Sequence, residues 1–123
     1  MKPVLRLALR SSSLSRQQHL EWQALYPEWD MVPVLLDTPG DRDLETSLLH
    51  GNPPVDFFTR DLDEAVRCGK ADAALHSAKD LPWPLPKDMA VWALGPCLDK
   101  QDSLCTISGQ SLDSLPPGAR VGT

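Results

Sequence analysis

The alternation of apolar and polar positions divides the chain into short aliphatic runs separated by amphipathic segments. Val4–Leu9 and Met31–Leu36 are aliphatic runs of strand length, and runs of this kind are typical of buried strands. Between them, the residues from about 14 to 26 follow three serines that can cap a helix, and they end at Pro27. The order strand, helix, strand predicts that the two strands pair in parallel.

A second helix and a third strand are predicted further along the chain. Apolar residues at the i, i+4, i+7 and i+8 spacing of an amphipathic helix begin at Phe58 and end at Val66. The helix predicted from them covers about 57–68, with Gly69 as its C-terminal stop. The apolar run Ala73–Leu75 is bounded by turn signals and predicts a short buried strand.

The remaining pattern predicts a turn, a long loop and less regular elements. Thr38–Asp41 has Pro and Gly at the central positions of a type II turn. The polar segment from this turn to about Pro54 is long for a loop without structure of its own, and we interpret it as a candidate lid. The weaker patterns predict strands at 90–94 and 103–107, a short helix or turn at 111–117 and the start of a strand at 120–123.

Composition narrows the class of protein. The 123 residues suffice for one domain, or for one domain and the start of another. The formal net charge of −5, without a basic run, argues against a nucleic-acid or membrane partner, so an anionic ligand must be held by a few placed cations. The odd set of cysteines, Cys68, Cys97 and Cys105, has no metal-like spacing and suits a reduced protein. No stretch is long enough to span a bilayer, so we expect a cytoplasmic protein. Because the cysteines lack metal-like spacing, we expect no metal site.

Charged and hydroxyl side chains follow two of the predicted strands: Arg10 ends the first, and Lys79 and Asp80 lie just beyond the third. Because the carboxyl ends of parallel strands meet at one edge of a sheet, these side chains would lie together with Ser77. The cations, the hydroxyls and the N-terminus of the first helix then form a rim for a carboxylate or phosphate, and Asp80 is the group able to handle a proton. The plainer interpretation is a set of unrelated turns with solvated charges. His76 follows the apolar run directly and is expected to be a hydrogen-bonded structural histidine.

Several stretches of the chain, taken in order, carry motifs that occur together in one enzyme family. They are Ala8–Ser15, Thr38–Asp41, Phe57–Asp63, Ala71–Pro82 and the segment from Ser111 to Thr123. The most specific is Ala71–Pro82, which matches the pattern Ala-Asp-x-Ala-x-His-Ser-x-Lys-Asp-x-Pro. On these motifs the chain resembles the N-terminal domain of porphobilinogen deaminase, also called hydroxymethylbilane synthase.

The resemblance implies a fold, a reaction and partners. The fold is α/β, like one lobe of the type II periplasmic-binding-protein architecture, with a mixed, mostly parallel sheet flanked by helices. Residues 1–95 would form the first domain, and 96–123 the crossover and the start of a second. The family joins four porphobilinogen units head to tail, releases ammonia and extends a covalently held dipyrromethane primer, as part of tetrapyrrole and heme biosynthesis. The implied partners are porphobilinogen, its pyrrole carboxylates and the remaining domains of the enzyme.

The same resemblance implies roles for individual residues. Asp80 matches the catalytic carboxylate beside the pyrrole nitrogens. The residues that match binders of the acetate and propionate groups of cofactor and substrate are Arg10, Ser12, Ser77 and Lys79. Phe58 matches an aromatic residue next to the growing chain, and 38–56 matches the mobile loop over the cleft. Loss of ammonia leaves an electron-poor azafulvene, which a fixed carboxylate can stabilise, and each condensation must later shed a proton, which it can relay.

The sequence also departs from the family pattern. Val55-Asp56 stands where the family usually has Lys-Gly, which exchanges a cation for an anion near the cleft. The chain ends before the family's paired arginines, and none of its three cysteines matches the cysteine that carries the primer. We therefore expect these residues to be inactive alone, as a fragment or as a short paralogue. The alternative is a non-catalytic module that binds a small anion and has lost the chemistry.

Overall fold

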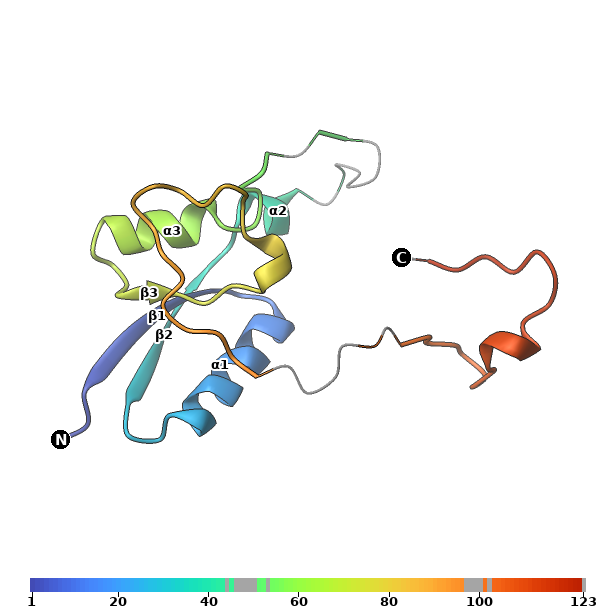
Figure 1. The fold of residues 1–123 in the computed structure, drawn as a ribbon, viewed down its shortest axis with the longest axis horizontal. Helices are drawn as coiled ribbons and strands as arrows, with labels where there is room; N and C mark the ends of the chain where they lie inside the picture. The colour runs from blue at the N-terminus through green and yellow to red at the C-terminus, as the bar shows by residue number, and fades with distance from the viewer. Residues whose placement is uncertain (44, 46–50, 53, 97–100, 102, 123) are drawn as a thin grey trace. The chain divides into compact units, whose positions relative to one another are not determined.

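The structure, a computed structural model, describes residues 1–43, 45, 51–52, 54–96, 101 and 103–122. It consists of two units, Met1–Ala93 and Leu94–Thr123. The first unit contains every described strand and α-helix (Figure 1), and the second has one turn of 3-10 helix, η2 (Leu112–Ser114), as its regular structure among the described residues. This turn lies where the sequence predicted a short helix or turn. The division into enzyme domains at residue 95 stays a prediction.

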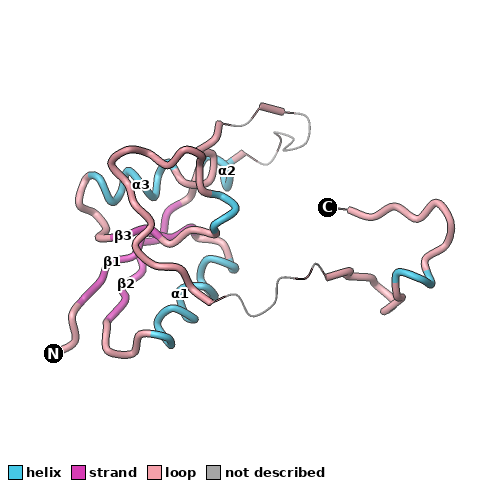
Figure 2. Tube along the Cα trace, viewed as in Figure 1, coloured by secondary structure: helices cyan, strands magenta, loops and turns pink. Residues whose placement is uncertain are grey.

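Three parallel strands form the sheet of the first unit, in the order β2-β1-β3. They are β1 (Val4–Arg10), β2 (Asp30–Leu36) and β3 (Ala73–Ala74). β1 pairs with β2 along its whole length and with β3 at Leu7 and Ala8, and the three strands lie side by side (magenta in Figure 2). Because the pairing is parallel, their carboxyl ends point to one edge of the sheet. The three strands predicted at 4–9, 31–36 and 73–75 are confirmed, and so is the parallel pairing of the first two. The described sheet has no antiparallel strand, although a mixed sheet was expected.

Helices cover both faces of this sheet. They are α1 (Ser13–Leu25) and α3 (Arg60–Arg67), close to the predicted segments. Buried residues of β1 alternate between the faces, because successive side chains of a strand point to opposite sides. Leu7 and Leu9 form a cluster against which Trp22 of α1 packs, whereas Ala8 clusters with Leu62 of α3. Of the helices that the structure describes, none has the length and apolar character needed to cross a membrane.

The segment 38–41 begins a helix, and the type II turn predicted there is wrong. The Thr38 side chain, at the start of α2 (Pro39–Arg42), accepts a hydrogen bond from the Asp41 backbone, while the Asp41 carboxylate accepts one from the Thr38 backbone. This reciprocal capping box starts a helix, and Pro fits its first position. The rest of the candidate lid lies partly outside the described residues, so its closure stays a prediction.

The strands predicted at 90–94 and 103–107 are also wrong, since both segments are irregular. An apolar run becomes a strand when it finds a neighbouring strand and a face to bury. Trp92 and Leu94 are instead 74% and 77% exposed, and no described strand pairs with them. Residues 120–122 are irregular as well, so the strand start expected there is not formed in the described part of that segment.

Candidate functional site

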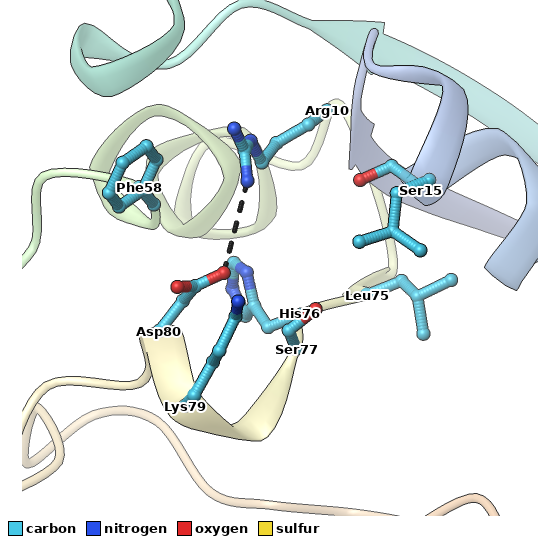
Figure 3. Close-up of a pocket in the computed structure, with 9 residues that line it drawn as sticks. Arg10, Ser15, Phe58, Leu75, His76, Ser77, Lys79 and Asp80 are labelled. Carbon is cyan, nitrogen blue, oxygen red and sulfur yellow. Dashed lines mark ion pairs between the residues drawn. The ribbon is translucent and has the colours of Figure 1, made fainter. Parts of the chain in front are cut away.

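A cavity of about 200 Å³ lies at the carboxyl ends of β1 and β3 (Figure 3). It is lined by Arg10, Leu14, Ser15, Phe58, Leu75, His76, Ser77, Lys79 and Asp80. All but one of the residues that the sequence singled out for binding or catalysis lie in this lining. The exception is Ser12, whose hydroxyl caps α1 by accepting a hydrogen bond from the Ser15 backbone at 3.3 Å. The juxtaposition expected at this edge is therefore confirmed, while the functional roles stay predictions.

Arg10 and Asp80 form the charged centre of the cavity. Arg10 is the last residue of β1, and Asp80 ends η1 (Ala78–Asp80), the single helical turn that follows β3. Nη1 of Arg10 lies 3.8 Å from Oδ2 of Asp80 (dashed line in Figure 3), and the two side chains are 23% and 17% exposed. Lys79 lies on the same turn, is exposed, and forms no ion pair with any residue the structure describes. Lys79 therefore supplies a cation that no described carboxylate neutralises.

Asp41 holds the guanidinium of Arg10 from the side of α2. Nε of Arg10 donates to both Asp41 oxygens at 3.0 Å, and Nη2 forms an ion pair with Oδ1. Thr38 adds two donors to Oδ2, its backbone N–H at 3.0 Å and its hydroxyl at 2.8 Å. The hydrogen bond from Arg10 is the main reason why the pKa of Asp41 falls from 3.8 to about 2, and it raises the pKa of Arg10. Asp41 is not among the predicted site residues, although the Thr-x-x-Asp spacing of a capping box was the signal for it.

Phe58 covers the same guanidinium. Cζ of Arg10 lies 4.7 Å from the centroid of the Phe58 ring, which is a cation–π distance. The ring also lies close to the backbone of α2, because a Cβ added at Gly40 would overlap three of its ring atoms. Gly40 is thus required for close approach of ring and backbone. Asp41 and Phe58 together fix the orientation of Arg10.

His76 is hydrogen-bonded, as predicted, and its partner is a buried carboxylate. Nε2 of His76 lies 2.9 Å from Oδ1 of Asp63 on α3. On the other side of the loop, the Ser77 hydroxyl accepts a hydrogen bond from Nε2 of Gln18, on α1, at 3.2 Å. These bonds tie the loop after β3 to both flanking helices, and the loop in turn positions Lys79 and Asp80.

Asp56, the unexpected anion, does not line the cavity. Its carboxylate accepts hydrogen bonds from Nε and Nη2 of Arg60 at 3.0 and 2.8 Å. The same contact lowers the pKa of Asp56 and raises that of Arg60. The negative charge is neutralised one turn along the chain, so this departure from the family pattern adds no free anion to the site.

The cavity combines the parts needed to hold a small organic acid. Lys79 and Arg10 supply positive charge, the Ser77 hydroxyl can donate a hydrogen bond, and Leu14 and Leu75 offer apolar contact. Ligands of open α/β sheets bind beyond the carboxyl ends of the strands, and their sites are mostly apolar with a few placed polar groups. The fold and the site thus define an α/β protein with a cavity suited to an anionic, partly apolar ligand.

Comparison with known proteins identifies the family. Residues 5–123 match the family model described as porphobilinogen deaminase, dipyromethane cofactor binding domain. Porphobilinogen deaminase of Syntrophotalea carbinolica is 36% identical over 125 residues, which cover 98% of this chain and 39% of that protein. Those of Roseiflexus castenholzii and Moorella thermoacetica are 37% and 38% identical, over 100% and 97% of this chain and 42% and 39% of their own length. The chain belongs to the porphobilinogen deaminase family and spans about two-fifths of these relatives.

The residues around the cavity fit the cofactor that the matched domain binds. A dipyrromethane group has flat pyrrole rings, N–H donors and carboxylate side chains. Phe58 and Leu75 provide apolar surface for a ring, Asp80 can accept a hydrogen bond from a pyrrole N–H, and Lys79 can pair with a carboxylate. The cysteine that carries the cofactor lies in another region of the full-length enzyme.

Proposed function

We propose that the protein joins porphobilinogen units head to tail into hydroxymethylbilane and releases ammonia, as a transferase of tetrapyrrole formation. The residues of the first unit hold the cofactor and the substrate. The observation that carries this proposal is the Asp80 carboxylate, 3.8 Å from Arg10, in a cavity that also contains Lys79.

The cations of the cavity bind and orient. Lys79 and Arg10 attract the carboxylate side chains of a pyrrole, and the Ser77 hydroxyl donates to the same groups. Arg10 is already held by Asp41, so little rearrangement is needed when a ligand arrives, and preorganised charge is the more effective kind. The dipyrromethane cofactor, when bound, supplies the terminal pyrrole to which the first porphobilinogen is joined.

Asp80 acts where positive charge develops. Loss of ammonia from porphobilinogen leaves an azafulvene whose methylene carbon is electron-poor and whose ring is cationic while its nitrogen keeps a proton. A carboxylate beside that nitrogen accepts the N–H hydrogen bond and stabilises the charge. The Asp80 side chain is only 17% exposed, and its effect is larger than it would be in bulk water.

We also propose a fold type, a cellular compartment and a dependence on further domains for this protein. The parallel sheet with helices on both faces supports an architecture like one lobe of a type II periplasmic-binding protein. The free thiols of Cys68 and Cys105 support a reducing compartment, the cytoplasm. The cavity of about 200 Å³ is smaller than the roughly 300–1,000 Å³ of a typical small-molecule site. It is therefore one wall of a larger site that the remaining domains complete, and the 123 residues alone do not turn over porphobilinogen.

Replacing Asp80 with asparagine tests the proposal in protein expressed from its complete gene. Porphobilinogen consumption should fall by about 10²–10³-fold, the loss typical when one preorganised electrostatic group is removed. The matched control is Asp88→Asn, which removes a carboxylate paired with Arg67 at 2.7 Å outside the cavity. Turnover in this control should stay at the wild-type rate.

Two results would contradict the proposal. One is a wild-type protein that consumes no porphobilinogen after loading with cofactor. The other is an Asp80→Asn variant that turns over as fast as the Asp88→Asn control. If the wild type binds a pyrrole carboxylate without consuming porphobilinogen, the protein is the non-catalytic anion-binding module instead.

A further inference from the structure

We propose that His76 is a second catalytic residue of this site, a base that takes a proton from the substrate while Asp80 stabilises the developing cation. The inference rests on the proposed transferase function and assigns one of its proton transfers to a named atom. Two observations support it: the place of His76 in the cavity wall and its bond to Asp63.

The imidazole lines the cavity. Figure 3 shows its ring among the side chains of the lining, on the loop that also carries Lys79 and Asp80. Nε2 is 2.9 Å from Oδ1 of Asp63, and because an ionised carboxylate only accepts hydrogen bonds, the proton of the neutral ring sits on Nε2. Nδ1 then carries the lone pair, and it has no hydrogen-bond partner among the described residues. The free basic nitrogen, Nδ1, therefore belongs to a residue that lines the cavity.

Asp63 is the buried carboxylate that a catalytic imidazole requires as a hydrogen-bond partner. The His76 and Asp63 side chains are 10% and 9% exposed, and Asp63 lies on α3, where its backbone N–H donates to the Thr59 carbonyl at 3.0 Å. Arg67, one turn further along α3, interacts with Asp63 through its charge without forming an ion pair with it. In serine proteases the same arrangement fixes the tautomer and stabilises the imidazolium that forms.

Each condensation releases one proton that requires an acceptor. The free α-carbon of the terminal ring forms a C–C bond with the azafulvene methylene carbon, and that α-carbon still carries its hydrogen. Nδ1 of His76 takes the proton, and the electron pair of the broken C–H bond returns to the ring and restores its aromaticity. The imidazolium, held by Asp63, then passes the proton to the released ammonia, which leaves as ammonium. Asp80 remains ionised throughout and keeps stabilising the cation.

Charged groups from three elements surround His76. Asp63 faces it from α3, Arg10 from the end of β1, and Lys79 and Asp80 from η1. The base is needed in its neutral form at the start of each cycle, so kcat should fall on the acid side as His76 becomes protonated.

The experiment measures kcat against pH for cofactor-loaded protein expressed from its complete gene. His76→Gln keeps an N–H donor toward Asp63 but has no basic nitrogen, and its kcat should fall by about 10²–10⁴-fold, the range of general acid–base catalysis. Its acid limb should disappear. In His76→Ala, added imidazole should restore turnover in proportion to its unprotonated fraction. Asp63→Asn should lower kcat because the amide no longer fixes the tautomer. The matched control is His19→Gln, whose imidazole contacts the Met31 carbonyl at 2.9 Å outside the cavity.

The outcomes separate this inference from the proposed function. A wild type without porphobilinogen turnover removes both. An active wild type whose His76→Gln variant keeps its kcat and its acid limb overturns only the role of His76. A His76→Gln variant that loses rate uniformly at every pH, together with a His76→Ala variant that imidazole does not rescue, shows that His76 only positions the loop and also overturns the inference. Thermal unfolding of both variants, measured beside His19→Gln, identifies any loss of rate caused by unfolding.

Discussion

Replacing Asp41 with asparagine should destabilise the first unit and loosen the charged centre of the cavity. The carboxylate accepts hydrogen bonds from Nε of Arg10 at 3.0 Å and from the hydroxyl of Thr38 at 2.8 Å. Asparagine keeps the volume but has no charge, and it presents an NH₂ group where the carboxylate offered an acceptor. At least one donor of Arg10 or Thr38 therefore loses its partner. Arg10 is then free to swing toward Asp80, which weakens anion binding.

The size of the effect follows from the titration of Asp41. Its pKa falls from 3.8 to about 2 in the folded protein, which corresponds to about 2.4 kcal/mol of stability at neutral pH. The Arg10 and Asp41 side chains are 23% and 16% exposed, and solvent screening reduces this value to about 1–2 kcal/mol. A loss of that size lowers the unfolding temperature by roughly 5–15 °C in a domain of this length.

The dependence on pH has a definite sign. A carboxyl whose pKa is lowered by folding stabilises the protein above the pKa of the unfolded chain, and this contribution is lost as the pH falls through the folded value. The stability advantage of the wild type over Asp41→Asn should therefore be complete at neutral pH and shrink by about half at pH 3. Asp72, whose pKa is also about 2, titrates in both proteins and cancels in the difference.

Urea unfolding at pH 7 and pH 3 measures this difference. The matched control is Asp88→Asn, because Asp88 is 58% exposed and pairs with Arg67 on the surface. Exposed pairs of this kind contribute about 0–1 kcal/mol, so the control should remain close to the wild type. The role of the Asp41 carboxylate is refuted if Asp41→Asn is as stable as Asp88→Asn at pH 7. It is also refuted if the loss in unfolding free energy, relative to the wild type, is the same at both pH values.

Two further substitutions test the packing around the site and in the core. Gly40→Ala should lower the free energy of unfolding by about 1–3 kcal/mol, because its Cβ would overlap the Phe58 ring, whereas Gly122→Ala has open space and should be neutral in the same thermal unfolding assay. Equal stability of these two variants would disprove the close approach of Phe58 to α2. Leu62→Ala removes a fully buried side chain between α3 and the sheet and should cost about 2–5 kcal/mol. Leu112→Ala, at a leucine that is 69% exposed, should change stability by less than about 0.5 kcal/mol, and a similar loss in both would place Leu62 outside the core.

The helices and strands that bury one face against the rest of the protein could be predicted from the sequence. For the segments that bury no face, the predicted structure was wrong. β1 and β2 are aliphatic over nearly their whole length, and both found partners in the sheet. The runs at 90–94 and 103–107 have similar composition but no neighbouring strand in the described part of the chain, and they are irregular. Apolar composition therefore identifies a candidate strand, whereas pairing depends on neighbours that a local pattern does not contain. At 38–41, Pro-Gly fits a turn and a helix start equally well, and the capping bonds of Thr38 decide for the helix.

In the candidate site too, the positions of some residues could be predicted from the sequence and those of others could not. Arg10, Lys79 and Asp80 could be placed together because parallel strands bring their carboxyl ends to one edge, whatever the details of packing. Asp41 and Asp63 could not be placed, since their contacts with Arg10 and His76 depend on how two helices are rotated about their axes. Sequence spacing fixes which face of a helix is apolar, but it leaves open which loop residue meets a given polar side chain.

In a protein with a negative net charge, binding of an anion would depend on the charged groups close to its site. The net charge is −5, yet the carboxylates around the site all have partners. Asp41 and Asp80 share Arg10, Asp56 pairs with Arg60, and Asp63 accepts a hydrogen bond from His76. Fields of exposed charges are screened within about 10 Å at ordinary ionic strength, so a ligand in the cavity responds to the groups that line it. There Lys79, on the same turn as Asp80, is the cation that has no carboxylate partner among the described residues. Binding should therefore depend steeply on that one ammonium group and only weakly on the overall charge of the chain.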